Sequence, residues 1–273
     1  MNPEFFLNIF VFLMGLIVGS FLNVCIVRLP KEQSIVKPRS QCVHCKKPIP
    51  WYDNVPLLSY LLLKGKCRSC HEKISPRYFI VELFTGISFV ILYQHVGLNL
   101  MLLAYLVMLS CLIVATFVDF ELRIIPDEVS VGGMIVGLVF SSLIPSLHMD
   151  NLNIYSPFKN HVISLGYSLL GVLVGGGSIY ILGMLGDFIF KKESMGGGDV
   201  KLMAMVGAFL GWKLALLAFF IAPFFGAIYG IIEKIRTKDS AIAYGPFLAL
   251  GSMISLFWGD KIIYMIANGY LLI

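Results

Sequence analysis

Four of the six cysteines form two pairs in which two residues separate the thiols, Cys42-Val43-His44-Cys45 and Cys67-Arg68-Ser69-Cys70. This spacing lets both thiolates of a pair bind one ion, and a second pair completes a tetrahedral set of four sulfur ligands. Four thiolates leave no open position on Zn²⁺, which is typical of a structural site. The sequence therefore predicts a structural zinc site formed by Cys42, Cys45, Cys67 and Cys70.

The segment that carries these pairs, residues 28–77, is the only long polar stretch of the chain. About 50 residues with few apolar side chains cannot bury enough core to fold unaided, so we expect the metal to supply that free energy. His44 and His71 could each replace a cysteine ligand, although four cysteines already suffice. Cys25 and Cys111 lie in apolar stretches and are interpreted as packing residues.

Two aspartates at the ends of apolar stretches offer a second kind of chemistry. Asp119 ends the stretch 98–118, and Asp199 follows the three glycines at 196–198. Two carboxylates held close together share a proton, so the pair can activate water as a base and protonate a leaving amine as an acid. The glycines would let a peptide strand approach the backbone closely. Asp119 and Asp199 are thus a candidate aspartic-protease pair, although their spacing alone does not bring them together.

Placement at helix ends is a simpler interpretation of the same acidic residues. Asp199 at a helix N-terminus would be favourable there without any catalytic role. Asp127, which follows Pro126, has a similar explanation. Glu82 and Asp187, at the edges of apolar stretches, could pair with a basic side chain or extend toward the membrane surface.

The elements that must position these residues are membrane helices. Of the 273 residues, 58% are hydrophobic and 14% are charged, whereas soluble domains carry about 25% charged residues. This composition excludes a soluble globule, and the modest net charge of +5 argues against disorder and nucleic-acid binding. A spanning helix needs about 20 mostly apolar residues. Eight stretches are predicted to span, of which 202–212 is short: 5–27, 78–94, 98–118, 129–147, 162–186, 202–212, 214–232 and 241–259.

The basic residues predict the orientation of these spans. If the N-terminus is outside, 18 of the 21 Lys and Arg residues lie on the inner side, and 11 of them are in the segment 28–77. Only Lys159, Lys213 and Lys261 lie outside, which is a clear positive-inside distribution. Both termini are therefore expected outside and the cysteine segment in the cytosol, where disulfides are disfavoured. The predicted fold class is an all-α, polytopic membrane protein with about eight transmembrane helices and a small cytoplasmic zinc-binding loop module.

Several motifs, taken together, resemble those of bacterial prepilin peptidases, the leader peptidases and N-methyltransferases of type IV pilus and type II secretion systems. The tetracysteine pairs, Asp119 and the Gly-x-Gly-Asp run ending at Asp199 belong to this resemblance, which covers residues 15–260. The other motifs are Gly19-Ser20-Phe21-Leu22-Asn23-Val24, Arg28-Leu29-Pro30, Pro50-Trp51-Tyr52-Asp53-Asn54-Val55-Pro56, Ile74-Ser75-Pro76-Arg77-Tyr78, Val81-Glu82-Leu83, Ile125-Pro126-Asp127 and Tyr244-Gly245-Pro246-Phe247.

The resemblance implies a function in which Asp119 and Asp199 are the catalytic pair. It implies a multi-pass enzyme of the bacterial inner membrane that cleaves the short basic leader of prepilins and pseudopilins on the cytoplasmic side. The new N-terminal residue would then be methylated with S-adenosylmethionine. Residues 1–97 would form the methyltransferase-associated part and residues 98–273 the peptidase. No glycine-rich fingerprint follows a strand, so spacing does not locate the methyl-donor site.

Two other functions compete with this interpretation. An intramembrane protease of the presenilin type shares Gly-x-Gly-Asp but cuts within a transmembrane helix, and the zinc-type loop weighs against it. A zinc-stabilised scaffold or a small transporter would not be an enzyme. For a transporter we would expect charged residues in the middle of the spans, and only Glu82 comes near to that position.

Overall fold

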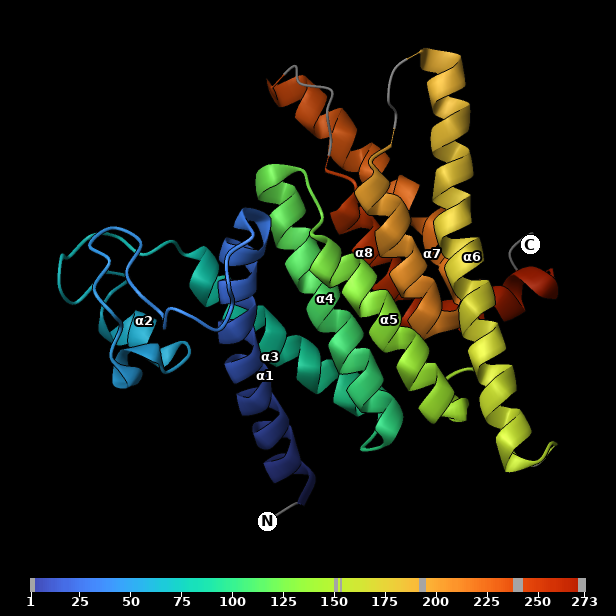
Figure 1. Cartoon of the computed structure of the whole chain (residues 1–273), viewed down its shortest axis with the longest axis horizontal. Coiled ribbons are helices and arrows are strands. Elements are labelled where there is room, and N and C mark those ends of the chain that lie inside the picture. Colours follow the sequence, from blue (N-terminus) through green and yellow to red (C-terminus); the bar gives the residue numbers. More distant parts are fainter. Residues whose placement is uncertain (1–2, 150–151, 153, 192–194, 238–242, 270–273) are drawn as a thin grey trace. The chain divides into compact units, whose positions relative to one another are not determined.

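The structure is a computed structural model that describes residues 3–149, 152, 154–191, 195–237 and 243–269. Within these ranges the regular elements are helices and none is a strand. The α-helices (Figure 1) are α1 (Pro3–Arg28), α2 (Leu58–Leu62), α3 (Arg77–Val96), α4 (Leu100–Leu122), α5 (Asp127–Leu143), α6 (Pro157–Phe190), α7 (Gly197–Thr237) and α8 (Gly245–Ala267). Short 3-10 turns lie at Leu29–Lys31, Trp51–Asn54 and Pro145–Leu147. The chain forms two compact units, Met1–Val114 and Ala115–Ile273, whose boundary lies inside α4.

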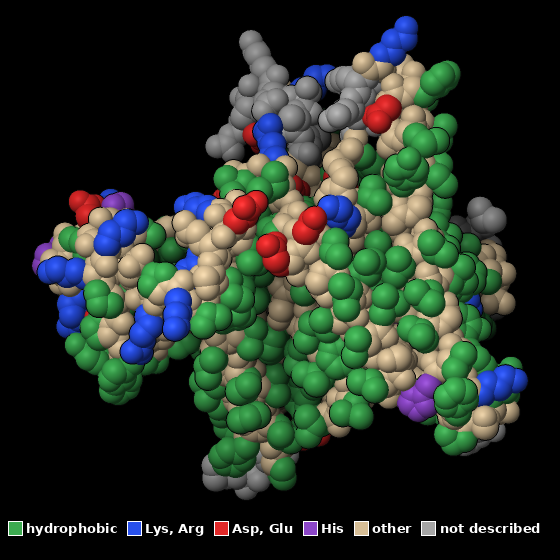
Figure 2. Space-filling model, viewed as in Figure 1, with side chains coloured by type: hydrophobic (Ala, Val, Ile, Leu, Met, Phe, Trp, Pro, Cys, Tyr) green, Lys and Arg blue, Asp and Glu red, His purple; other side chains and the backbone are tan. Residues whose placement is uncertain are grey.

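The surface of the helices is predominantly apolar. Among the described residues, α1, α3, α4, α6, α7 and α8 are long and apolar enough to cross a membrane. Figure 2 shows hydrophobic side chains over most of the visible helical surface, whereas Lys and Arg gather on the segment between α1 and α3. Phe5, Phe10 and Ile17 of α1 are each more than half exposed. Continuous apolar surface of this kind is stable against lipid and not against water, so the chain is a multi-pass membrane protein.

In the first unit, α1 and α3 pack together through small residues. A side-chain carbon on Gly15 would lie 2.7 Å from Cα of Gly86, and one on Gly19 would lie 2.8 Å from Cα of Glu82. Helices that approach so closely gain contact along their backbones, which replaces the missing hydrophobic driving force in lipid. The amide of Asn23 adds a hydrogen bond of 3.0 Å to the carbonyl of Tyr78 at the start of α3.

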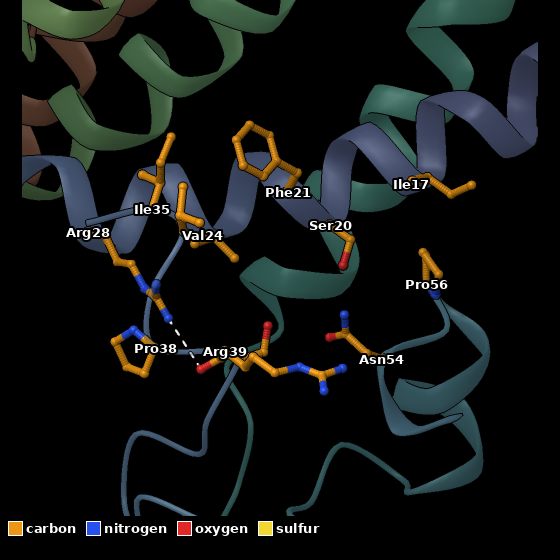
Figure 3. A pocket seen from close by; sticks show the side chains of 12 residues that line it. Ile17, Ser20, Phe21, Val24, Arg28, Ile35, Pro38, Arg39, Asn54 and Pro56 are labelled. Carbon is orange, nitrogen blue, oxygen red and sulfur yellow. Dashed lines mark hydrogen bonds between the residues drawn. The ribbon is translucent and has the colours of Figure 1, made fainter. Parts of the chain in front are cut away.

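The segment between these helices, residues 29–76, is called the loop module here. It is tied to α3 by the N–H of Leu57, which donates to Oε2 of Glu82 at 2.8 Å. An open cleft of about 350 Å³ lies between the loop module and α1 (Figure 3). Residues from both elements line it, so the module and the helix together form its walls.

In the second unit, the central contact is the crossing of α6 and α7. A side-chain carbon on Gly171 would run into the carbonyl of Gly207, and the reverse holds as well. Beside this crossing, the hydroxyl of Ser168 donates to the carbonyl of Ala208 at 2.7 Å. Close approach of the two backbones therefore requires glycine at both positions.

Helix α7 folds back on itself at Gly211, where φ is 74° and ψ is 174°. A side-chain carbon on Gly175 would touch the carbonyl of Met203 and lie 3.5 Å from Cβ of Ala215. In a straight helix, residues 203 and 215 would be about 18 Å apart. Both arms of α7 therefore lie beside α6, and α7 contributes two antiparallel segments (Figure 1).

This geometry explains why eight stretches were predicted and six long helices are found. The stretches 202–212 and 214–232 are the two arms of α7. The stretch 129–147 is helical only as α5, which has 17 residues and ends before Pro145, because the residue preceding a proline disfavours helical geometry. Residues 241–242 of the last predicted stretch lie outside the described residues, and α8 begins at Gly245.

Candidate active site and metal centre

The structure brings the four paired cysteines together. The sulfur atoms of Cys42, Cys45, Cys67 and Cys70 all lie within 4.8 Å of one another, and those of Cys42 and Cys70 are 3.8 Å apart. Tetrahedral coordination with Zn–S bonds of about 2.3 Å places sulfur atoms about 3.8 Å apart. All six cysteines of the chain are free thiols. The cluster can therefore hold one metal ion, and its four-thiolate chemistry fits Zn²⁺.

The two cysteine turns repeat one backbone design. In each turn, the N–H of the first cysteine donates to the carbonyl five residues later, from Cys42 to Lys47 and from Cys67 to Glu72. Each turn also has a left-handed residue after its second cysteine, with φ 59° at both Lys46 and His71. This repetition was not recognised in the sequence, although the equal Cys-x-x-Cys spacing is a signal of it. It presents the sulfur atoms of both turns to a common centre.

Electrostatics within the cluster favour metal binding. Hydrogen bonds from the backbone N–H groups of Cys70 and Ser69 lower the pKa of the Cys67 thiol to about 6. The N–H of Glu72 lowers the pKa of Cys70, but burial and the neighbouring cysteines outweigh it and raise that pKa to about 12. A second thiolate is thus costly next to the first. A divalent cation would remove this cost by compensating the negative charge.

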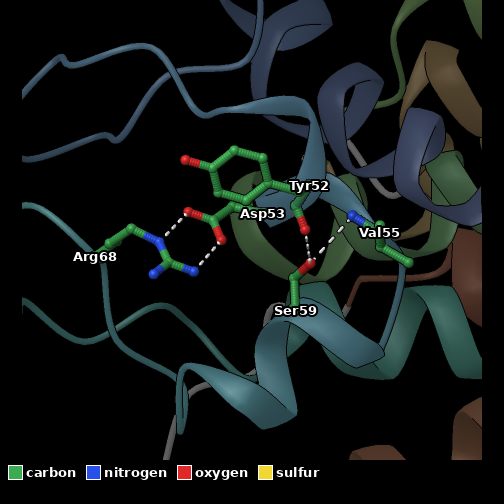
Figure 4. Close-up of polar contacts among 5 residues, drawn as sticks. All are labelled: Tyr52, Asp53, Val55, Ser59 and Arg68. Carbon is green, nitrogen blue, oxygen red and sulfur yellow. Dashed lines mark hydrogen bonds and ion pairs between the residues drawn. The ribbon is translucent and has the colours of Figure 1, made fainter.

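A polar network joins the second cysteine turn to the middle of the loop module (Figure 4). Arg68, between Cys67 and Cys70, donates two hydrogen bonds to the carboxylate of Asp53, at 2.6 and 2.7 Å. The guanidinium also lies 5.6 Å from the ring centre of Tyr52. These hydrogen bonds lower the pKa of Asp53. Such bidentate pairing fixes geometry as well as charge, so Arg68 positions the turn that supplies two of the four sulfur atoms.

Asp119 lies at the C-terminal end of α4, within the second unit, and is only 5% exposed. Its Oδ2 accepts a hydrogen bond of 2.9 Å from the N–H of Gly245, the first residue of α8. A side-chain carbon on Gly245 would lie 2.9 Å from the same oxygen and 3.1 Å from Cδ1 of Ile125. Asp119 is therefore unlike an ordinary helix-end aspartate, which is exposed to solvent. Its carboxylate is buried, and one of its oxygens accepts a hydrogen bond from a backbone N–H of a residue that has no side chain.

Asp199 lies in the first turn of α7 and is 9% exposed. It is close enough to Asp119 for the two charges to interact. Gly198, the preceding residue, packs against Ile125, the same side chain that contacts Gly245. The C-terminal end of α4 and the N-terminal ends of α7 and α8 therefore meet near Ile125. The structure thus brings together the two aspartates that the sequence singled out.

Two neighbours of this pair were not assigned a role from the sequence. Gly245 is the hydrogen-bond donor to Asp119, and the preceding Tyr244 is close enough to interact with Asp199. Burial and the negative charge of Asp199 raise the pKa of Tyr244 to about 12. The only signal for both in the sequence was the Tyr-Gly-Pro-Phe run, which does not state what the residues contact.

The remaining acidic candidates have other surroundings. Asp127, the first residue of α5, forms an ion pair of 2.7 Å with Lys201, and both side chains are largely exposed. Asp187 is exposed near the end of α6. Glu82 belongs to the first unit, where it is 8% exposed and accepts hydrogen bonds from Leu57 and from Ser20. Glu82 therefore anchors the loop module to α3.

These features define a class: a multi-pass membrane protein with a buried pair of aspartates and a tetracysteine cluster that can hold a metal ion. Comparison with known proteins identifies the family. Residues 13–96 match the bacterial peptidase A24 N-terminal domain, and residues 106–231 match the type IV leader peptidase family. The chain belongs to the type IV leader peptidase family.

Similar proteins from several bacteria carry the name prepilin leader peptidase/N-methyltransferase. One from Myxococcus xanthus is 39% identical over 84% of this chain, and the alignment covers 64% of that protein's length. One from Aeromonas salmonicida is 32% identical, with 92% of this chain and 91% of the relative covered. One from Legionella pneumophila is 32% identical, and the alignment covers 96% of this chain and 95% of the relative. No solved structure matches this chain.

Proposed function

We propose that Asp119 and Asp199 are the catalytic pair with which this chain cleaves the leader from prepilins and pseudopilins. Family membership makes the chain a prepilin peptidase with N-methyltransferase activity. The observation that carries the residue assignment is the meeting of two nearly buried carboxylates from α4 and α7, one held by the N–H of Gly245. Arg123 is close enough to Asp119 for their charges to interact, but two carboxylates at short range still repel each other, which is more typical of a functional site than of a structural ion pair.

The pair can hydrolyse a peptide bond without any other group. One carboxylate is ionised and the other protonated, because both cannot ionise cheaply at short range. The ionised carboxylate removes a proton from water, whose oxygen then bonds to the peptide carbonyl carbon. The protonated carboxylate gives its proton to the leaving amine as the C–N bond breaks. Because Gly245 holds only Oδ2 of Asp119, the other oxygen remains available for water.

The proposed orientation suits a substrate with a basic leader and an apolar stem. The Lys and Arg distribution supports an orientation in which the aspartate-bearing ends of α4 and α7 and the loop module face the cytosol and both chain termini lie outside. In the bacterial inner membrane, the leader would then remain in the cytosol while the stem lies in the bilayer. The scissile bond would meet the aspartates at the boundary between the two.

The second activity is assigned to the N-terminal part of the chain. We propose that residues 1–97 form the methyltransferase-associated part and residues 98–273 the peptidase, a division supported by the family match that ends at residue 96 and the one that begins at 106. Zn²⁺ bound by the four cysteines would hold the loop module together. S-adenosylmethionine, when bound, would supply the methyl group that the neutral N-terminal amine accepts in exchange for one of its protons.

The test is cleavage of a purified prepilin by variants of the pair, followed by mass spectrometry. Asp119→Asn and Asp199→Asn keep the side-chain size but remove the shared proton, so each should abolish cleavage. The double variant should be no worse, because the residues act as one unit. Asp127→Asn is the matched control, since it removes an exposed carboxylate from an ion pair and should keep substantial activity.

The outcomes separate the competing functions. Methylation of a pre-cleaved substrate should survive in all three aspartate variants, because that chemistry belongs to another site. Cleavage at the wild-type rate by a well-expressed Asp199→Asn protein would remove the aspartic-protease mechanism. A cut within the transmembrane stem, in place of leader removal, would support an intramembrane protease of the presenilin type.

A further inference from the structure

The cleft between α1 and the loop module has a chemistry that the peptidase reaction does not use. Apolar side chains line most of it, among them Ile17, Phe21 and Val24 of α1. The polar lining residues include Arg28 of α1 and Arg39 and Asn54 of the module. Figure 3 shows the side chains of Arg39, Asn54 and Ser20 directed toward the same space. Its volume of about 350 Å³ is in the range of small-molecule sites, which are mostly apolar with a few converging polar groups.

The side of the cleft that carries Arg28 and Arg39 is suited to bind an anion. Arg28 donates to the carbonyls of Ser34, at 2.8 Å, and of Arg39, at 3.5 Å, and so braces the backbone of this part of the module. The guanidinium of Arg39 itself has no hydrogen-bond or ion-pair partner among the described residues. An unpaired guanidinium next to an apolar wall is suited to the bidentate binding of a carboxylate.

The opposite corner of the cleft is backed by an acidic side chain. Ser20 lines the cleft, and its hydroxyl forms a hydrogen bond with the buried carboxylate of Glu82. The cleft is therefore dipolar, with a guanidinium on one side and a carboxylate behind a hydroxyl on the other. A purely anionic ligand would use only the first of these groups. A ligand that has a carboxylate, a cationic centre and an aromatic part would use both, together with the apolar wall.

We propose that this cleft binds S-adenosylmethionine, with Arg39 pairing the carboxylate of its methionine part. The assignment rests on the proposed methyltransferase function. The acidic corner, near Ser20 and Glu82, suits the positively charged part of the donor. The wall at Phe21 suits the adenine ring, since aromatic faces stack favourably. Asn54 offers an amide donor and acceptor for a polar edge of the ligand.

The test measures binding to the full-length protein in phosphatidylcholine nanodiscs, with S-adenosylhomocysteine as the probe because it cannot react. Arg39→Gln should weaken binding about 10- to 100-fold, as expected for the loss of a charge-assisted bidentate pair. Lys31→Gln is the matched control: it removes one exposed positive charge from the same segment, does not line the cleft, and should leave binding unchanged. Zinc content shows that each variant retains a folded module.

A second ligand makes the assignment specific to the carboxylate. 5′-Methylthioadenosine keeps the adenosine and sulfur but lacks the carboxylate, so Arg39→Gln should change its affinity less than twofold. An equal loss for both ligands, or unchanged binding of S-adenosylhomocysteine by Arg39→Gln, would overturn the proposal. Loss of co-purifying anionic phospholipid from Arg39→Gln, with the probe still bound, would make the cleft a lipid site instead. If the wild-type protein binds no probe at all, the methyltransferase function itself fails, which is a distinguishable result.

Discussion

Replacing Gly245 by alanine tests the geometry around Asp119 without touching either aspartate. The new Cβ would lie 2.9 Å from Oδ2 of Asp119, whereas an ordinary contact of this kind is at least about 3.4 Å. Asp119 is 5% exposed, so its carboxylate cannot turn freely into water. We therefore expect it to shift by about 0.5 Å, which also lengthens the hydrogen bond from the N–H of residue 245.

The size of the effect follows from this shift. A misplacement of about 1 Å in a catalytic group costs about 100-fold in rate, so about 0.5 Å corresponds to roughly 10-fold. Weakening the hydrogen bond by about 1 kcal/mol adds roughly a factor of 5. For stability, alanine gains up to about 1 kcal/mol in helix propensity, while crowding costs about 1–3 kcal/mol. Prepilin cleavage should thus fall about 10- to 50-fold, mainly in kcat, in a protein that remains folded.

The assay is the initial rate of prepilin cleavage by purified protein in detergent, with thermal unfolding measured in parallel. Gly132→Ala is the control, because Gly132 is helical and a side-chain carbon there would meet nothing within 4 Å. Cleavage at the wild-type rate by folded Gly245→Ala would refute the placement of Gly245 against a catalytic carboxylate. The Ile125→Val substitution removes the Cδ1 atom that lies 3.1 Å from the new carbon. If adding it to Gly245→Ala restored the wild-type cleavage rate, the crowding would act through Ile125, and Asp119 would not be displaced.

Three further predictions concern the metal, the orientation and the pH dependence. Elemental analysis should find about one zinc per chain, and serine at any of the four paired cysteines should lower that content and destabilise the loop module more than it slows cleavage. Cysteine labelling at Lys37 and Lys159 should report opposite sides of the membrane, and labelling of both from one side would break the assigned orientation. Burial lowers the pKa of His148 to about 4 from 6.5, so the unfolded chain binds more protons between these values and stability falls as the pH drops through that window, by up to roughly 3 kcal/mol. Unfolding between pH 7 and 4.5 should show this loss in the wild type and a smaller one in His148→Gln.

The cysteine cluster was predictable because it depends on residue types at short spacing. Two thiols separated by two residues reach one ion wherever the turn is placed, and the doubled pair identified all four cysteines of the cluster. The membrane helices were predictable for a similar reason, since every lipid-exposed backbone must satisfy its own hydrogen bonds. Only their ends and count differed, at Pro145 and at Gly211, where local backbone geometry ends or bends a helix.

What the sequence determined by itself is therefore the set of groups and the lipid environment: four thiols on one polar segment, two aspartates at the ends of apolar stretches, and helices to carry them. Tertiary structure alone decided which of these groups meet. Asp119 and Asp199 lie 80 positions apart in the sequence, and the N–H that holds Asp119 comes from Gly245, 126 residues away. Such contacts depend on how closely helices approach, and that depends on glycines such as Gly171 and Gly207, where a single methyl group would push two backbones apart.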